Sequence, residues 1–384
     1  MTRTVSDGRS LDGWRAELRA WFGEHVPHDL PPLDDHAASA GYRAWERELA
    51  DAGYAAVHWP VEHGGRAASE PERLVFQEEY ERAGGPARIN IQSLMLAGPT
   101  LMAFGTARQQ RRWLPAMLRS DEVWCQGFSE PDAGSDLASL RTQAVRQGDD
   151  LVVNGQKIWT TGAHYSDWVF ALVRTGKEGP KHHGISWLMV DLRTPGVQVR
   201  PIVQLNGRPE FAEIFFEDVR VPVDNVVGGL GNGWRVAMAA LGFERGVGRR
   251  SYVQYLTRLE YLRRAIASAG VRLEPAIELE FGEVLAQVLM YRDYTARVAA
   301  EAASEHPTAT SAYNKLIWSE IQVRLFQLGE RVLRATGDLR DGGGTAAAEE
   351  WMAEYWYSRA ARIFAGTNQI QKNIIADRVL KLPR

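Results

Sequence analysis

The apolar residues of this chain change their spacing twice, and these changes limit the folds open to it. Over roughly the first 120 residues they recur every three or four positions, which is the period of a half-buried helix. Short β-branched and aromatic runs follow Asp121, and long helical stretches return from Gly233. The order predicts an α+β multidomain fold: an N-terminal all-α domain (1–121), a middle antiparallel β-barrel or sandwich domain (122–228) and a C-terminal four-helix bundle (229–384).

The expected elements follow from the same patterns. We expect helices at 11–22, 42–52, 72–83, 91–104, 107–118, 234–246, 251–268, 277–304, 311–336 and 346–364, and strands at 123–128, 151–153, 157–161, 168–174, 185–191, 197–201 and 211–216. Asn154-Gly155 is expected to form a hairpin turn, because both residues tolerate positive φ. A last helix is expected after Gly366, where Asn368 and Gln371 have capping-box spacing. Asp341 to Thr345 is expected to be a loop.

Composition excludes several classes of partner. The net charge of −3 gives no reason to expect nucleic acid. No apolar run approaches the ~20 residues of a membrane span. Cys125 is the single cysteine among the 384 residues, which excludes an intrachain disulfide and suits a reducing cytoplasm. We therefore expect a cytoplasmic protein with a sizeable core and no membrane span.

One stretch, Gln126 to Thr161, combines the groups that a flavin requires. Its first part, from Gln126 to Asp136, offers small residues, hydroxyls and exposed backbone N–H groups. Its second part, from Asn154 to Thr161, carries a tryptophan and two threonines. Together they are suited to present an indole to the face of a flat ring and hydrogen bonds to its polar edge. Such contacts hold a flavin while electrons arrive.

Four ordered segments carry a family resemblance. They are Ser-Glu-Pro-Asp-Ala-Gly-Ser-Asp (129–136), Gly-Gln-Lys-Ile-Trp-Thr-Thr (155–161), Phe-Glu-Asp-Val-Arg-Val-Pro (216–222) and Ala-Gly-Thr-Asn-Gln-Ile-Gln (365–371). In this order and across nearly the whole chain, they resemble the acyl-CoA dehydrogenase family. The resemblance implies the same three-part fold. It also implies bound FAD and desaturation of an acyl thioester between Cα and Cβ.

The resemblance implies a role for each of several residues near FAD. Phe128 and Ser129 would lie at the ring edge, with Ser129 near N1 and O2, and Gln126 begins that segment. Thr161 would lie near N5 and Trp159 on the ring face away from substrate. Gly134 and Ser135 would lie near the pyrophosphate and the thioester arm, and Thr367 and Gln369 near the flavin phosphates. Singly, each residue is also compatible with ordinary strand or core packing.

The sequence departs from the family pattern where the catalytic base is expected. Many members have a glutamate directly before the C-terminal Gly-Thr, and here that residue is Ala365. Some members place the base on the first helix of the bundle, and the matching residue here is Glu244. We expect Glu244 to remove the Cα proton, Arg245 to orient nearby groups, and the Ala365 amide to donate to the thioester oxygen. The alternative is a solvated Glu-Arg pair.

A second departure concerns partners. The family segments that hold the adenine end of FAD from a neighbouring subunit do not match here at 263–267 and 331–335. The resemblance therefore implies either a homotetramer or a two-partner heterotetramer. The substrate would be an acyl-CoA or an acyl carrier protein thioester, from fatty acid or sterol side-chain metabolism. An electron-transfer flavoprotein-like carrier would accept the electrons. A non-catalytic subunit and a flavin monooxygenase or oxidase are the rival hypotheses, and no metal site is expected.

Overall fold

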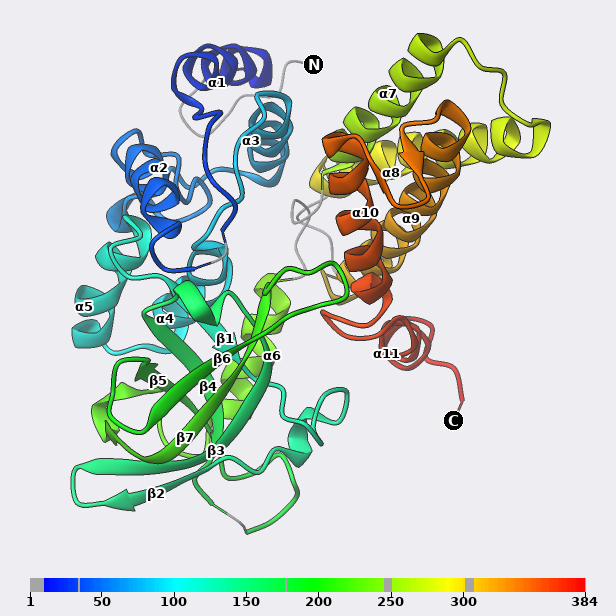
Figure 1. The fold of residues 1–384 in the computed structure, drawn as a ribbon. Helices are drawn as coiled ribbons and strands as arrows, with labels where there is room; N and C mark the ends of the chain where they lie inside the picture. Colours follow the sequence, from blue (N-terminus) through cyan, green and yellow to red (C-terminus); the bar gives the residue numbers. More distant parts are fainter. Residues whose placement is uncertain (1–9, 34, 177, 245–250, 301–306, 384) are drawn as a thin grey trace.

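The computed structural model describes residues 10–33, 35–176, 178–244, 251–300 and 307–383, without the side chains of 243–244 and 307–311. Its helices and strands separate into three parts (Figure 1). Helices from the first third of the chain cover one side of a β-sheet, and the C-terminal helices stand beside both. The predicted succession of a helical, a β and a second helical part is confirmed.

The N-terminal part consists of helices, and side-chain caps set the starts of α1, α3 and α5. Ser10 accepts from the Gly13 amide, and capping boxes begin at Ser69 and Thr106. Trp14, Leu18 and Phe22 repeat at helical spacing and are buried. The helices are α1 (Leu11–His25), α2 (Ser39–Asp51), α3 (Glu70–Arg82), α4 (Gly98–Phe104) and α5 (Ala107–Leu118).

A short π-helix, Ser93–Ala97, precedes α4 within the single helix expected at 91–104. The Leu94 carbonyl accepts from the Trp59 indole at 2.8 Å and contacts His58 Nε2 at 3.1 Å. Burial, with Arg73 nearby, lowers the pKa of His58 to about 3, so its ring is neutral. Wide turns of this kind are frequent at functional sites.

The β-part is one sheet with strand order β6-β7-β3-β2-β4-β5-β8, and β1 pairs with β4 at its side. Its strands are β1 (Trp124–Gly127), β2 (Gln143–Gln147), β3 (Asp150–Thr161), β4 (Trp168–Arg174), β5 (Ile185–Asp191), β6 (Val197–Ile202), β7 (Phe211–Pro222) and β8 (Val226–Val227). Most pairings are antiparallel, as expected. The pairings of β4 with β1 and with β2 are parallel.

The prediction of a hairpin turn at Asn154-Gly155 is wrong. These residues lie inside β3, where the register against β7 shifts between Val153 and Gly155. Gly155 has φ +145° and the Asn154 side chain bonds Asp218, so the pair forms an irregularity within a long strand. The β2–β3 turn lies earlier, where Gly148 has positive φ.

The C-terminal part contains α6 (Gly233–Glu244), α7 (Tyr252–Ala269), α8 (Pro275–Ala300), α9 (Pro307–Thr336), α10 (Ala346–Ser358) and α11 (Asn368–Ile374). Helices α7 to α10 surround a common core that includes Leu262, Val288 and Trp351. The expected loop at 341–345 includes a small pairing of β9 (Leu339–Arg340) with β10 (Gly343–Gly344). The prediction that Asn368 caps the last helix is wrong, because Thr367 caps α11 by accepting from the Ile370 amide.

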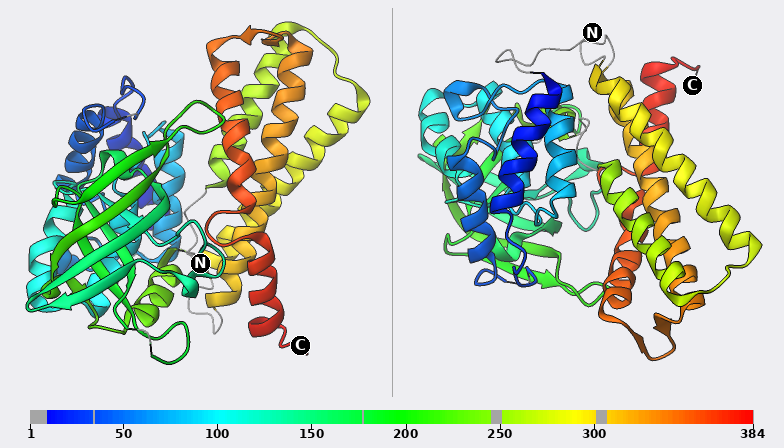
Figure 2. Two further views of the ribbon diagram at one scale, coloured as in Figure 1. Left: turned by 60° about the horizontal axis from the view of Figure 1, so that its bottom comes forward. Right: turned by 90° about the horizontal axis from the view of Figure 1, so that it is seen from above.

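The bundle stands beside the sheet and the N-terminal helices (Figure 2). The loop between β6 and β7 reaches α10, where Arg208 forms an ion pair with Glu350. On the other side, the Tyr252 hydroxyl of α7 donates to Glu78 of α3 at 2.7 Å. Within the described ranges, no helix is both long and apolar enough to cross a membrane.

Candidate active site

Trp159 is turned outward by a bulge at the end of β3. The β3–β7 register shifts between Lys157 and Thr160, and Trp159 takes φ +60° there. A bulge re-aims side chains, and positive φ is strained for an aromatic residue. Trp159 is consequently 57% exposed, although the residues on both sides of the bulge, Lys157 and Thr160, are fully buried. Thr161, two residues on, is also exposed.

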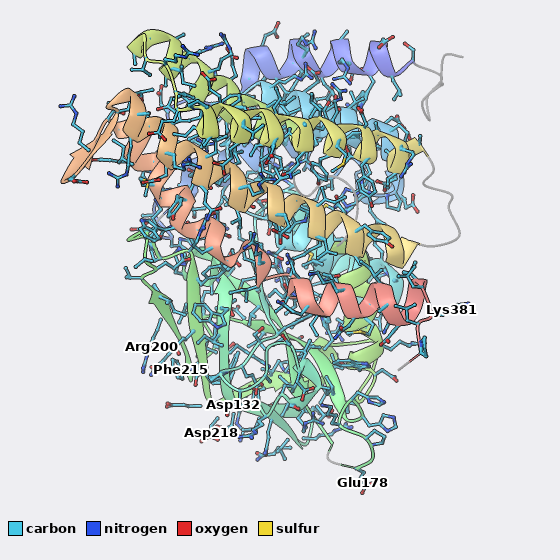
Figure 3. All side chains as sticks on the ribbon, turned by 90° about the vertical axis from the view of Figure 1, so that its right-hand side faces the viewer. Asp132, Glu178, Arg200, Phe215, Asp218 and Lys381 are labelled. Carbon is cyan, nitrogen blue, oxygen red and sulfur yellow. The ribbon has the colours of Figure 1, made fainter. Side chains whose placement is uncertain are left out.

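The segment after β1 lies directly against this bulge. The Ser129 carbonyl accepts from the Ile158 amide at 3.0 Å, which joins two of the sequence segments that carry the resemblance. Phe128 is buried against Phe170 and Trp187, whereas Gln126 and Ser129 are half-buried. The chain then forms an exposed loop, from which Asp132 projects at the surface of the sheet part (Figure 3).

Gly134 and Ser135 both lie exposed in this loop. A Cβ built on Gly134 would meet no atom within 4 Å, so the space around it is open. The two residues therefore present backbone and a hydroxyl to solvent on the same loop that begins beside Trp159. This arrangement is suited to contact with the arm of a large ligand.

A buried ion pair beneath the loop was missed by the sequence reasoning. Lys157 Nζ lies 2.7 Å from Glu130 Oε1, and the side chains are 0% and 7% exposed. Burial lowers the pKa of Lys157 to about 8, although Glu130 opposes the shift. The available signal was one basic and one acidic residue, each inside a segment otherwise expected to contact flavin.

The C-terminal segment forms a strained turn before α11. Ala365 has φ +54° and Gly366 has φ +80°. The turn is fixed from both sides: Thr367 caps α11, and the buried Gln371 amide donates to the Ala365 carbonyl at 3.1 Å. Gln369 is exposed on the first turn of that helix.

Aromatic side chains connect this turn with the Trp159 bulge. The ring centroids of Trp159 and Phe211 lie 6.0 Å apart, and those of Phe211 and Tyr357 of α10 lie 6.2 Å apart. Tyr357 in turn contacts Phe364 at 5.9 Å, and Phe364 directly precedes Ala365. Residues from the middle and the end of the chain are thus linked through three ring contacts.

Helix α6 carries the expected base at its last residue. Val236, Ala237 and Ala240 of this helix are fully buried in the core shared by the sheet and the N-terminal helices. The Glu244 side chain and the whole of Arg245 lie outside the described residues, so their roles stay predictions.

The described residues fit a flat ring with a polar edge. The strained, exposed indole of Trp159 offers one face, and the half-buried Ser129 and exposed Thr161 offer hydrogen bonds close by. Elsewhere in the part that the structure describes, no cluster of three His, Cys, Asp or Glu side chains is arranged to hold a metal ion.

Comparison with known proteins gives a consistent result. Family models match in three ranges: acyl-CoA dehydrogenase N-terminal domain at 11–121, middle domain at 125–219 and C-terminal domain at 231–380. The chain is 42% identical to acyl-CoA dehydrogenase IpdE1 of Mycobacterium tuberculosis, covering 98% of this chain and 99% of the relative. It is 40% identical to IpdE1 of Mycolicibacterium smegmatis, with 97% of each chain covered.

Two solved structures share the fold over almost the full length. One is described as "Tcur3481-Tcur3483 steroid ACAD", with a TM-score of 0.85, 30% identity and coverage of 97% of this chain and 98% of that one. The other is the ChsE4-ChsE5 complex from Mycobacterium tuberculosis, with a TM-score of 0.83, 31% identity and the same coverage. Both are described by two chain names.

Proposed function

Because the chain belongs to the acyl-CoA dehydrogenase family, whose members are oxidoreductases acting on CH–CH groups, we propose that it binds FAD and desaturates an acyl thioester between Cα and Cβ. The observation that carries the proposal is the outward indole of Trp159, held at φ +60° beside Ser129. An exposed aromatic on a strained bulge stabilises little in the protein itself. Its geometry is explained by a ligand stacked on it.

The proposed cofactor contacts follow from the segments around Trp159. Ser129 and Phe128 would contact the polar edge of the ring, Gln126 would support that edge, and Thr161 would donate near N5. Further contacts would come from Gly134, Ser135, Thr367 and Gln369 along the pyrophosphate. When bound, FAD supplies the acceptor for the hydride that leaves Cβ.

We propose Glu244 as the base that takes the Cα proton. Ala365 has no acidic group, so this carboxylate has to come from elsewhere in the chain. One face of α6, with Val236, Ala237 and Ala240, is buried in the core shared with the sheet and the N-terminal helices, and the helix ends at Glu244. Burial among apolar groups would raise the pKa of this carboxylate, which is the property that a base working near neutral pH requires. Arg245 would orient neighbouring groups, and the Ala365 amide would stabilise the enolate oxygen.

For the acyl group, we propose a steroid-derived or fatty acid carried as a thioester of CoA or of an acyl carrier protein. Support comes from the similar structure described as a steroid ACAD. The electrons would leave to an electron-transfer flavoprotein-like carrier. We propose a tetramer, formed by this chain alone or with a second kind of subunit, as the two-chain descriptions of similar structures suggest.

The test is to purify the protein, record its visible spectrum and mix it anaerobically with straight-chain and steroid-derived acyl-CoAs. We expect a flavin spectrum that bleaches with at least one thioester. The Glu244→Gln variant should retain bound flavin and show no bleaching, because a carboxamide cannot accept the Cα proton. Bleaching by this variant at the parent rate would disprove the base assignment.

A non-catalytic subunit is the second candidate, and the arginines near the expected adenine site favour it. Arg263 and Arg264 both bond Glu260 of their own helix, and Arg331 bonds Glu280. These guanidinium groups are therefore already paired within the chain. A colourless protein that gains flavin only when mixed with a second subunit, and whose Glu244→Gln form leaves the activity of that complex unchanged, would establish this candidate.

A further inference from the structure

Lys157 is a fully buried cation in the middle of the sheet part. Its side chain is 0% exposed, and its Nζ donates to Glu130 Oε1 at 2.7 Å and to the Phe128 carbonyl at 3.2 Å. A buried ion pair adds little net stability, since removing two charges from water offsets most of their attraction. Stability alone therefore gives a weak reason for a charged pair at this position.

The Glu130 carboxylate extends this contact to the far end of the exposed loop. It accepts from the Arg141 amide at 2.6 Å and from the Thr142 amide at 2.9 Å. The Thr142 hydroxyl also donates to the Gln156 carbonyl of β3 at 3.2 Å. Both ends of the segment 128–142 are thus held against the same stretch of β3.

The residues held in this way are the proposed cofactor contacts. Phe128 is bonded directly by Lys157, and Ser129 is bonded to Ile158, the next residue of β3. Gly134 and Ser135 lie in the exposed part between the two fixed ends. Loss of the Lys157 ammonium would therefore remove a contact on which both the ring-edge residues and the position of Glu130 depend.

We propose that Lys157, through its ion pair with Glu130, is a positioning residue that fixes the segment 128–142 in the geometry that binds FAD. The inference rests on the proposed function, since FAD is the ligand concerned. It assigns to two residues a role in cofactor affinity that is separate from their contribution to folding.

The charge state of this pair makes the proposal measurable against pH. Lys157 has a pKa of about 8, lowered by burial from the ordinary lysine value, so it loses its proton as the pH rises through about 8. The Lys157 charge and hydrogen bonds to the carboxylate outweigh burial and hold the pKa of Glu130 below its usual range. FAD affinity should thus be highest near neutral pH and fall as Lys157 becomes neutral.

Other titratable groups lie on the elements packed around Lys157. Cys125 of the adjacent β1 has a thiol whose pKa burial raises to about 12. On β7, Glu213 accepts from the Gln156 amide at 2.7 Å, and Gln156 faces the side of β3 opposite to Lys157. Asp136 of the loop pairs with Lys181 in solvent, and these two side chains are 58% and 59% exposed.

The experiment measures FAD affinity of the apoprotein by flavin fluorescence, beside its thermal unfolding. In Lys157→Met and in Glu130→Gln we expect affinity to fall by roughly tenfold or more, because each leaves one buried charge without its partner. Lys181→Met is the matched control: it removes the lysine that pairs with the exposed Asp136 of this loop. Its affinity should stay within about twofold of the parent.

The double variant Lys157→Met with Glu130→Gln separates positioning from folding. It leaves no unpaired buried charge, so we expect unfolding temperature to recover above that of Lys157→Met, while FAD affinity stays low. The parent should lose affinity between pH about 7 and about 9, and the double variant should be flat over that range.

Three outcomes would overturn the inference. They are parent-like affinity in Lys157→Met, recovery of affinity together with stability in the double variant, and a parent affinity that does not change through pH about 8. The last requires no substitution, so it applies even if a variant fails to fold. A parent protein that binds no FAD would overturn the proposed function itself. The three outcomes above, in a parent that does bind FAD, would overturn only the positioning role of Lys157.

Discussion

At the scale of single residues, positive φ marks two of the proposed contacts. Trp159 and Ala365 both lie in the left-handed region, at φ +60° and +54°, where residues with a side chain are strained. Each is held by its surroundings: Trp159 by the bulge against β7, and Ala365 by the Gln371 amide. Strain maintained in this way is typical of sites that need a fixed geometry.

Replacing Trp159 with alanine tests the role of its indole. The side chain is 57% exposed, so we expect apoprotein unfolding to change by less than about 1 kcal/mol. FAD affinity should fall about twofold to tenfold, because an aromatic stacking contact contributes about 0.5–1.5 kcal/mol. Fluorescence titration with FAD measures the loss. Val203→Ala is the control, since Val203 is 71% exposed and is not among the proposed contacts. Equal affinity in the two variants would contradict stacking on Trp159.

At the scale of elements, the packing of α9 against α10 depends on one glycine. A Cβ at Gly329 would lie 2.0 Å from Trp351 Cζ2, in the middle of the bundle core. Trp351 is fully buried, so its ring has no space into which it could move. The two helices can approach this closely only because residue 329 has no side chain.

Gly329→Ala should therefore destabilise the protein by about 1–3 kcal/mol, as overpacked cores do. The same substitution at Gly282 of α8 is the matched control. A Cβ there would meet nothing within 4 Å, and we expect Gly282→Ala to stabilise the protein by about 0.5–1 kcal/mol through helix propensity. Urea unfolding of both variants measures the difference. If both substitutions changed the free energy of unfolding in the same direction, the close α9–α10 contact would not require glycine at position 329.

Local signals predicted most of these elements. The capped and strongly periodic helix at 107–118 and the apolar strands at 168–174 and 185–191 agree with the structure at both ends. The sequence did not reveal that Asn154-Gly155 lies within β3, because pairing with β7 overrides the local turn preference.

Strand β2 was not predicted, because most of its residues are exposed and it therefore has little apolar pattern. The domain limits 1–121, 122–228 and 229–384 remain a proposal.

The candidate site was less open to sequence reasoning than the fold. The resemblance identified Trp159, but no local pattern predicts that a bulge turns its ring outward. The Lys157–Glu130 pair joins residues 27 positions apart, and its burial follows from the folded sheet rather than from neighbouring residues. Long-range contacts of this kind are set by packing, which a single sequence does not display.

At the scale of the whole molecule, a buried polar contact reinforces the apolar core that joins the N-terminal helices to the sheet part. Arg43 of α2 is 8% exposed, and its guanidinium donates to Asp167 at 2.9 Å and to the Tyr165 carbonyl at 3.1 Å. Asp167 also accepts from the Val123 amide at 2.8 Å. The arginine therefore joins α2 to the starts of β1 and β4, the strands that lead toward the candidate site.

Arg43→Met should lower the free energy of unfolding by about 3 kcal/mol, because it removes the buried guanidinium from Asp167 and leaves only the more exposed His36 ring, 3.6 Å away, beside that carboxylate. Arg47→Met on the same helix is the control. Its pair with Asp121 is 2.9 Å long, but the two side chains are 41% and 48% exposed, so we expect a loss of about 0.5 kcal/mol or less. Urea unfolding followed by tryptophan fluorescence compares the two. If both arginines proved equally dispensable, this buried contact would add nothing to the apolar core between the N-terminal helices and the sheet.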